Sequence, residues 1–368
     1  MKGVIMQVQN ISGKKNRILV INPGATSTKI AVFDDEMPLF KTLVEHSNVD
    51  LGKFPSVFAQ RDYRTELVMQ ALTKENIPIE SLTAVVGRGG LLKPSAGGTY
   101  RVNEQMVDDL KKAERGEHAS NLGAVIAYAL ASKLGIPAFI VDPVTVDEME
   151  PVARISGLPE LARISTSHTL NQKAVARAVA QEMGKSYEDV NFIVVHLGTG
   201  ISVTPHRRGR MIDTNSANEE GPFSLDRCGG LPASALVKLC YSGKYTLPEL
   251  MSKLVGKGGM YAYLGTKDAR EAEKMEKDGD QQASLVMDAL AYQIAKEIGA
   301  MAAVLCGDVE RIIFTGGLAN SKRIVDEIIK RIQFIAPIVL MPGEKEMEAL
   351  AAGALRVLRN EEPAKSYQ

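Results

Sequence analysis

The stretch Arg17–Asp34 (RILVINPGATSTKIAVFD) constrains the fold more than any other part of the sequence. Two apolar runs flank the polar segment Asn22–Lys29, which predicts two buried strands joined by a tight turn. Gly24 allows a close approach of the backbone. Converging N–H groups, hydroxyls such as that of Ser27, and the charge of Lys29 would suit phosphate oxygens. Taken alone, the segment is equally an ordinary hairpin loop, because small polar residues dominate turns.

The same pattern returns in Asn191–Asp213, where the turn His196-Leu197-Gly198-Thr199-Gly200 separates two apolar runs. A third apolar run leads into glycines at Arg311–Asn320. Two such hairpins, each opening a half of the chain, predict an internally duplicated α/β protein with a cleft between its halves. The connection would be Pro143–Ile164, which is punctuated by proline and glycine. We expect one domain over residues 1–150 plus 348–368, the closing helix returning to it, and a second over 151–347.

Composition excludes several classes of protein. The 368 residues are 45% hydrophobic and 24% charged, with 44 Lys+Arg against 44 Asp+Glu. This balance gives no attraction to nucleic acid or anionic membranes, and the absence of Trp argues against base-stacking surfaces. The three cysteines lack C-x-x-C spacing and indicate a reducing compartment. The N-terminal segment lacks a signal-peptide core and no apolar run would span a membrane, so we expect a cytoplasmic protein.

Charged side chains follow two predicted strands directly. Arg88 lies among glycines at the end of the apolar run Ala84–Val86, and Asp142 follows Ala138–Val141. Ligand loops lie at this end of strands in α/β sheets. Arg88 is otherwise a solvated residue of a glycine-rich turn, and Asp142 is either a metal-facing carboxylate or the start of a turn.

Two histidines stand near predicted helix starts. His118 opens the predicted helix His118–Leu134, and His168 follows the hydroxyl run Ser165-Thr166-Ser167 before another helix. Both positions are also typical of helix caps, which serine and threonine favour strongly. The residue types alone leave the functional and capping interpretations open.

The glycine motifs limit which class of phosphate-binding protein this chain can be. The chain has no G-x-x-x-x-G-K-[ST], and Val203 stands where G-x-G-x-x-G needs its third glycine. What remains is a set of glycine and hydroxyl turns, two arginines (Arg88 and Arg227), and Asp142 and Glu346 as candidate Mg²⁺ partners. This set fits phosphoryl transfer, in which positioning and charge stabilisation supply most of the catalysis.

Five motifs, in this order, resemble the acetate and butyrate kinase family: Ile21 to Lys29, Ser165 to His168, His196 to Gly200, Asp226 to Gly230, and Phe314 to Ser321. That family belongs to the superfamily of actin, sugar kinases and the seventy-kilodalton heat-shock chaperones. The resemblance runs from about Arg17 to Leu358 and is closer to butyrate kinases. Ile164 replaces the first histidine of the acetate kinase F-H-G-T-S-H motif and Gly230 replaces an aspartate, so roles tied to those two residues do not carry over.

The resemblance implies two ribonuclease-H-like (actin-like ATPase) domains around a central cleft, with ATP/ADP and Mg²⁺ as cofactors. It implies catalytic roles for Asn22, Arg88, Asp142, Arg227 and His168, substrate contacts from Arg88 and His118, and Mg²⁺ association for Asp142 and Glu346, with Glu344 as an alternative to Glu346. The nucleotide and its phosphates would contact Ser27, Lys29, His196, Gly198, Thr199, Gly200, Gly316, Gly317, Leu318 and Asn320.

We therefore expect a butyrate kinase: reversible in-line transfer from MgATP to butyrate or a branched relative, giving an acyl phosphate. Such an acid is already ionised at neutral pH and needs no general base. The alternatives are an acetate or propionate kinase, a sugar or polyol kinase with Asp142 near its hydroxyl acceptor, and an ATP-gated binding module. We expect a homo-oligomer, dimer or higher, with no nucleic-acid or membrane partner.

Overall fold

The computed structural model describes residues 15–368 of the chain. The N-terminal residues on which the signal-peptide expectation depends lie almost entirely outside this range. The strands are β1 Arg17–Pro23, β2 Ser27–Asp34, β3 Met37–Glu45, β4 Ala84–Gly87, β5 Thr99–Arg101, β6 Ala138–Val141, β7 Asn191–Leu197, β8 Ile201–Arg207, β9 Arg210–Met211, β10 Arg311–Gly316, β11 Ile338–Pro342 and β12 Lys365–Ser366.

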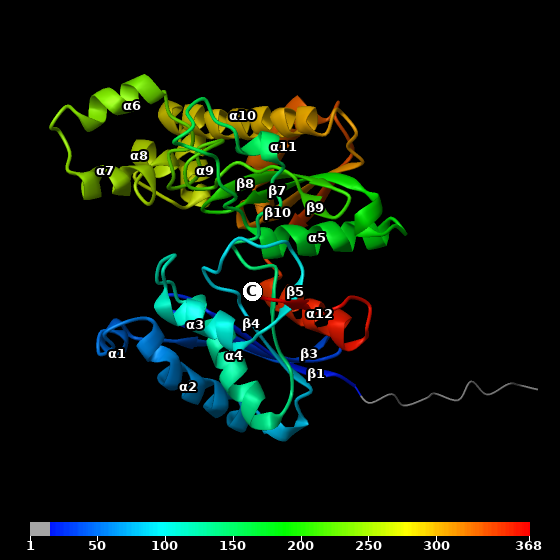
Figure 1. The fold of residues 1–368 in the computed structure, drawn as a ribbon. Helices are drawn as coiled ribbons and strands as arrows, with labels where there is room; N and C mark the ends of the chain where they lie inside the picture. The colour runs from blue at the N-terminus through cyan, green and yellow to red at the C-terminus, as the bar shows by residue number, and fades with distance from the viewer. Residues whose placement is uncertain (1–14) are drawn as a thin grey trace, which may run out of the picture.

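Helices lie on both sides of each sheet (Figure 1). They are α1 Asn48–Leu51, α2 Arg61–Lys74, α3 Glu104–Lys112, α4 Asn121–Leu134, α5 Thr169–Glu182, α6 Ala233–Cys240, α7 Leu247–Leu254, α8 Gly259–Leu264, α9 Ala269–Lys277, α10 Gln281–Val304, α11 Lys322–Ile332 and α12 Glu346–Leu358. None of these helices is long and apolar enough to cross a membrane.

The two sheets repeat one topology. The first has the order β12-β5-β6-β4-β1-β2-β3 and the second β11-β10-β7-β8-β9. In each, an antiparallel hairpin (β1–β2 or β7–β8) is followed outward by two parallel strands, β4 and β6 or β10 and β11. The predicted duplicated α/β fold is confirmed.

The core strands are buried on both faces, which explains their continuous apolar runs. Ile18, Leu19, Val20 and Ile21 of β1 are all fully buried, as expected for a central strand of a sheet whose two faces are both covered by helices. Alternate residues of β1 contribute to two separate cores, one on the side of α2 and α4 and one on the side of α12.

Helices α5 and α12 lie between the two sheets (Figure 1). Val175 and Val179 of α5 pack in the core below β7 and β10, while Leu350 and Ala354 of α12 pack on the first sheet. Strand β12 then pairs with β5. The carboxyl ends of β4 and β7 lie where these two helices begin. Arg88, directly after β4, pairs with Glu346 at the start of α12, and His196, near the end of β7, stacks on His168, directly before α5. The domain limits at residues 150 and 347 stay a prediction.

Candidate active site

Two cavities lie at the carboxyl ends of the strands. The first, which we call the arginine cleft, measures about 430 Å³ and is lined by residues that include Asn22, Arg88, His118, His168, Arg227 and Glu346. The second, the glycine-loop cavity, measures about 850 Å³ and is lined by residues that include Gly198, Thr199, Gly317, Leu318 and Asn320. Residues predicted from five separate motifs therefore gather in two adjacent places.

Asn22, Arg88 and Glu346 form one connected cluster in the arginine cleft. Asn22 lies near the end of β1 and Arg88 directly follows β4, and the parallel register pairs Ile21 with Gly87. The first residue of α12, Glu346, completes the cluster: its Oε2 accepts from Asn22 Nδ2 at 2.8 Å, and its Oε1 pairs with Arg88 Nη1. Three segments far apart in sequence thus meet around one carboxylate.

Arg227 enters the cleft from the second half of the chain. Its Nη1 donates to the carbonyl of Ala217 at 3.0 Å, while its buried Nε makes no hydrogen bond within residues 15–368 and lies 3.9 Å from Asp226 Oδ1. Burial lowers the pKa of Arg227, and the neighbouring Asp226 opposes that change. The guanidinium lies against the turn after β7, because a Cβ added to Gly200 would lie 2.3 Å from Nη1.

His118 lies in the turn before α4 and does not open the helix. Its Nδ1 lies 2.8 Å from Ser120 Oγ and accepts from the Ser120 N–H at 3.2 Å. This local bonding keeps His118 out of the helix, which begins at Asn121, so the predicted start at His118 was wrong. Burial, followed by the charge of Arg88, lowers the pKa of His118.

His168 and His196 are stacked, with ring centroids 3.8 Å apart and planes 7° from parallel. His168 immediately precedes α5 but makes no capping hydrogen bond with its side chain. Nδ1 of His196 lies 3.1 Å from Asn171 Nδ2, and its Nε2 lies 3.3 Å from Glu344 Oε1 without hydrogen-bond geometry. The interaction with His196 lowers the pKa of Glu344.

The glycine-loop cavity joins the turns after β7 and β10 to the beginning of α9. The polar residues Lys267, Asp268, Arg270 and Glu273 also line it. They were not predicted from the sequence, because they belong to no glycine motif and only the tertiary fold brings α9 beside the two turns.

The first turn is held by an arginine that was not predicted either. The buried Arg64 of α2 donates to the carbonyls of Gly24 at 2.9 Å, Ser27 at 3.2 Å and Ala25 at 3.1 Å. Ser27 and Lys29 belong to β2 and line neither cavity. The Lys29 charge nevertheless contributes to the low pKa of Glu344.

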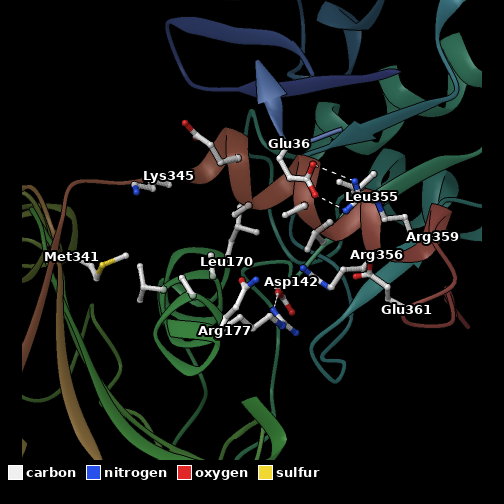
Figure 2. Close-up of a pocket in the computed structure, with 18 residues that line it drawn as sticks. Glu36, Asp142, Leu170, Arg177, Met341, Lys345, Leu355, Arg356, Arg359 and Glu361 are labelled. Carbon is white, nitrogen blue, oxygen red and sulfur yellow. Dashed lines mark hydrogen bonds and ion pairs between the residues drawn. The ribbon is translucent and has the colours of Figure 1, made fainter. Parts of the chain in front are cut away.

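Asp142 is not brought into the arginine cleft. It is 1% exposed and lines a different cavity of about 460 Å³ beside α5 and α12 (Figure 2). Its Oδ1 accepts from the Gly98 N–H at 2.7 Å and its Oδ2 pairs with Arg177 at 3.1 Å. Burial alone would raise its pKa, but Arg177 and Lys173 outweigh burial and lower it. Asp142 is therefore an ionised group already occupied by protein partners.

Several buried polar atoms at the site lack a hydrogen-bond partner in the described part of the chain. They are His196 Nε2, which faces Glu344 Oε1 at 3.3 Å without a hydrogen bond, and Asp226 Oδ1 and Arg227 Nε, which face each other at 3.9 Å. Buried polar groups are nearly always hydrogen-bonded.

A family model described as the acetokinase family matches residues 161–348, which is just over half of the chain. The chain belongs to the acetokinase family. Membership makes this protein a carboxylate kinase that uses ATP.

Solved structures give the same fold. An acetate kinase from Porphyromonas gingivalis is 19% identical with a TM-score of 0.76, over 93% of this chain and 100% of that one. A propionate kinase from Francisella tularensis subsp. tularensis SCHU S4 is 18% identical with a TM-score of 0.72, over 92% and 98%. A ROK family protein from Streptococcus pneumoniae TIGR4, solved with sucrose, is 12% identical with a TM-score of 0.52, over 94% and 100%. The predicted actin-like ATPase architecture is confirmed.

Proposed function

We propose that this member of the acetokinase family transfers the terminal phosphoryl group of ATP directly to butyrate or a branched relative and catalyses the reverse reaction. The observation that carries the proposal is the convergence of Arg88, Arg227 and Glu346 on one cleft beside the glycine-loop cavity. The nucleotide would occupy the glycine-loop cavity, with its phosphates directed past Gly200 toward Arg227.

The charges of the arginine cleft suit this reaction. The obstacle is the approach of an anionic carboxylate to an anionic phosphate, because the acid itself is ionised at neutral pH. Arg88 would bind the carboxylate, and Arg227 would stabilise the phosphoryl group as it is transferred. His118 and His168 line the same cleft and would donate hydrogen bonds to either anion.

The family typically uses a divalent metal, and the donor atoms of the cleft fit Mg²⁺. Residues 15–368 contain no cluster of three or more His, Cys, Asp or Glu side chains arranged to hold a metal. Mg²⁺ usually takes one or two carboxylates together with substrate phosphates, so a full protein cage is not needed. Glu346 would hold it in place of its present contacts with Arg88 and Asn22, and the ion would neutralise charge on the nucleotide phosphates. Asp142, paired with Arg177, would instead link β6 to α5.

An alkyl chain has an apolar surface to contact in the cleft. Pro23, Leu91, Val144 and Ala217 all line it. This surface supports an acid longer than acetate, although one methylene changes binding by only about 1–3 kcal/mol. Acetate and propionate therefore remain the alternative substrates. A cytoplasmic homo-oligomer stays a prediction.

A hydroxamate assay of acyl phosphate formation over acids of two to six carbons tests the substrate. We expect the highest kcat/KM at four carbons. Val144→Phe should fill the apolar side and shift the preference toward acetate by about tenfold or more. Val152→Phe is the matched control, since Val152 is 76% exposed and lies outside the cleft. An optimum at two carbons, or no response to Val144→Phe, would overturn the butyrate assignment.

The same assay separates the other classes. Arg88→Ala should lower turnover by roughly 10²–10³-fold, as expected for a lost transition-state donor. Phosphorylation of glycerol or a hexose but of no carboxylate would favour a sugar or polyol kinase. ATP turnover that does not depend on any carboxylate would favour an ATP-gated binding module.

A further inference from the structure

The stacked histidines are supported from behind by buried side chains that belong to none of the five motifs. The antiparallel register of β7 and β8 places Ser202 opposite His196. Helix α5 crosses the same face and contributes Asn171 and Gln172, one turn after His168. Ser202 and Gln172 are fully buried, so their hydrogen bonds are made only with the protein.

The direction of each hydrogen bond at Ser202 can be worked out from its partners. Gln172 Nε2 donates to the Ser202 carbonyl at 3.1 Å, and because a carbonyl only accepts, this contact fixes which end of the Gln172 amide carries hydrogen. The same nitrogen donates to Ser202 Oγ at 2.9 Å, and the His168 backbone N–H approaches Oγ at 3.5 Å. Both lone pairs of the hydroxyl therefore face donors.

The hydroxyl proton of Ser202 is left for His168. Its Oγ lies 2.9 Å from His168 Nδ1, so Nδ1 is the acceptor. A neutral imidazole that accepts at Nδ1 carries its proton on Nε2. His168 Nε2 makes no hydrogen bond to residues 15–368, and the ring lines the arginine cleft. The N–H of the ring is therefore free for a ligand in that cleft.

The ring stays neutral for a separate reason. Burial, followed by the neighbouring His196, Arg227 and Arg88, places the pKa of His168 well below its usual range. A third positive charge is thus avoided beside the two arginines, while the ring keeps a hydrogen-bond donor.

We propose that Ser202, oriented by Gln172, is a positioning residue that fixes His168 as the Nε2–H tautomer, which donates to a phosphoryl oxygen in the arginine cleft. The identity of the acceptor rests on the proposed function, whereas the tautomer does not. His196 follows the same rule. Asn171 Oδ1 accepts from the Lys345 N–H at 3.4 Å, so its Nδ2 faces His196 Nδ1 and leaves the proton on Nε2.

The tautomer is measured by nitrogen NMR of the full-length protein labelled at histidine, without ligand. The chain has five histidines, and His168→Gln identifies the signal of interest. We expect an unprotonated Nδ1 and a protonated Nε2 throughout pH 6.5–8. A protonated Nδ1 would overturn the proposal, and this result does not depend on any activity. If the tautomer is found but no carboxylate is phosphorylated, the proposed function fails alone.

The positioning role is tested with Ser202→Ala. Without the hydroxyl proton, His168 should populate the Nδ1–H tautomer, and kcat should fall by roughly tenfold or more while KM for ATP stays within threefold. Ser202→Thr keeps the hydroxyl and should restore most of the turnover and the Nε2–H signal. Thr204→Val is the matched control, because Thr204 is equally buried on the same face of β8 and its hydroxyl contacts Thr214 at 3.1 Å. A Ser202→Ala variant with the parent tautomer and turnover would refute the assignment.

Discussion

A methyl group at Gly200 should disable Arg227 without unfolding the protein. A Cβ at this position would lie 2.3 Å from Arg227 Nη1 and 2.6 Å from Cζ, closer than side chains normally approach. The backbone of Gly200 is outside the left-handed region, so alanine is not strained there. The atom in the way is the end of a flexible side chain. We therefore expect the guanidinium to move and the loop to stay.

The size of the effect follows from what Arg227 would lose. The displaced guanidinium gives up its bond to the Ala217 carbonyl and its place in the arginine cleft. Losing one preorganised donor to a transition state costs about 2.7–4 kcal/mol, or roughly 10²–10³ in kcat. The change in the free energy of unfolding should be small, since alanine at an unstrained glycine position stabilises by about 0.4–1 kcal/mol through the unfolded state.

The assay is acyl phosphate formation by Gly200→Ala, Arg227→Ala and the double variant, with thermal unfolding in parallel. Because the methyl acts through Arg227, it should cause no further loss in the Arg227→Ala background. Gly299→Ala is the control: this exposed position of α10 has nothing within 4 Å, and the variant should keep full turnover. Turnover of Gly200→Ala within threefold of the parent, beside a hundredfold loss in Arg227→Ala, would refute the steric reasoning.

Three further outcomes are expected. Burial, followed by the charge of Arg64, lowers the pKa of His46 to about 4, so the unfolded state binds more protons below pH 6.5 and stability falls with acid. Urea unfolding of His46→Gln should lose about 2 kcal/mol less than the parent between pH 7 and pH 5, and equal losses would contradict the burial argument. Lys173→Met leaves the buried Glu148 unpaired and should cost about 3–5 kcal/mol in denaturant unfolding, against at most about 1 kcal/mol for Lys322→Met in an exposed ion pair. EDTA should abolish phosphoryl transfer but leave the unfolding temperature of the nucleotide-free protein unchanged, and a lower temperature would indicate a preformed metal site.

The sequence predicted those features that local patterns determine. The hairpin of Arg17–Asp34 consists of an apolar run, a polar run and a second apolar run. The repetition of this pattern near His196 was enough to indicate the duplication. The placement of Arg88 and of the glycine turns follows from the rule that parallel strands end at one edge of a sheet.

The supporting residues could not be predicted in this way, because their roles depend on contacts between distant segments. Arg64 holds the first turn from α2, and nothing in its helical surroundings distinguishes it from a surface arginine. Asp142 has the position expected of a metal ligand, yet the partner that neutralises it, Arg177, lies on a helix of the other half of the chain. The sequence contains one signal for the residues that support His168, because His168, Asn171 and Gln172 are spaced to lie on one face of a helix. This signal can be interpreted only once the structure shows that Ser202 faces them.

The incomplete pairing at the site is consistent with binding rather than with a defect of packing. Arg227 Nε and His196 Nε2 make no hydrogen bond within residues 15–368 and face only the carboxylates of Asp226, at 3.9 Å, and Glu344, at 3.3 Å. Each atom therefore keeps part of the cost of about 1–3 kcal/mol of an unsatisfied buried group. The buried ion pair of Lys173 and Glu148 is fully satisfied, which means that the same fold can pair buried charges where no ligand is needed. A ligand that supplies acceptors to these atoms would recover that free energy on binding.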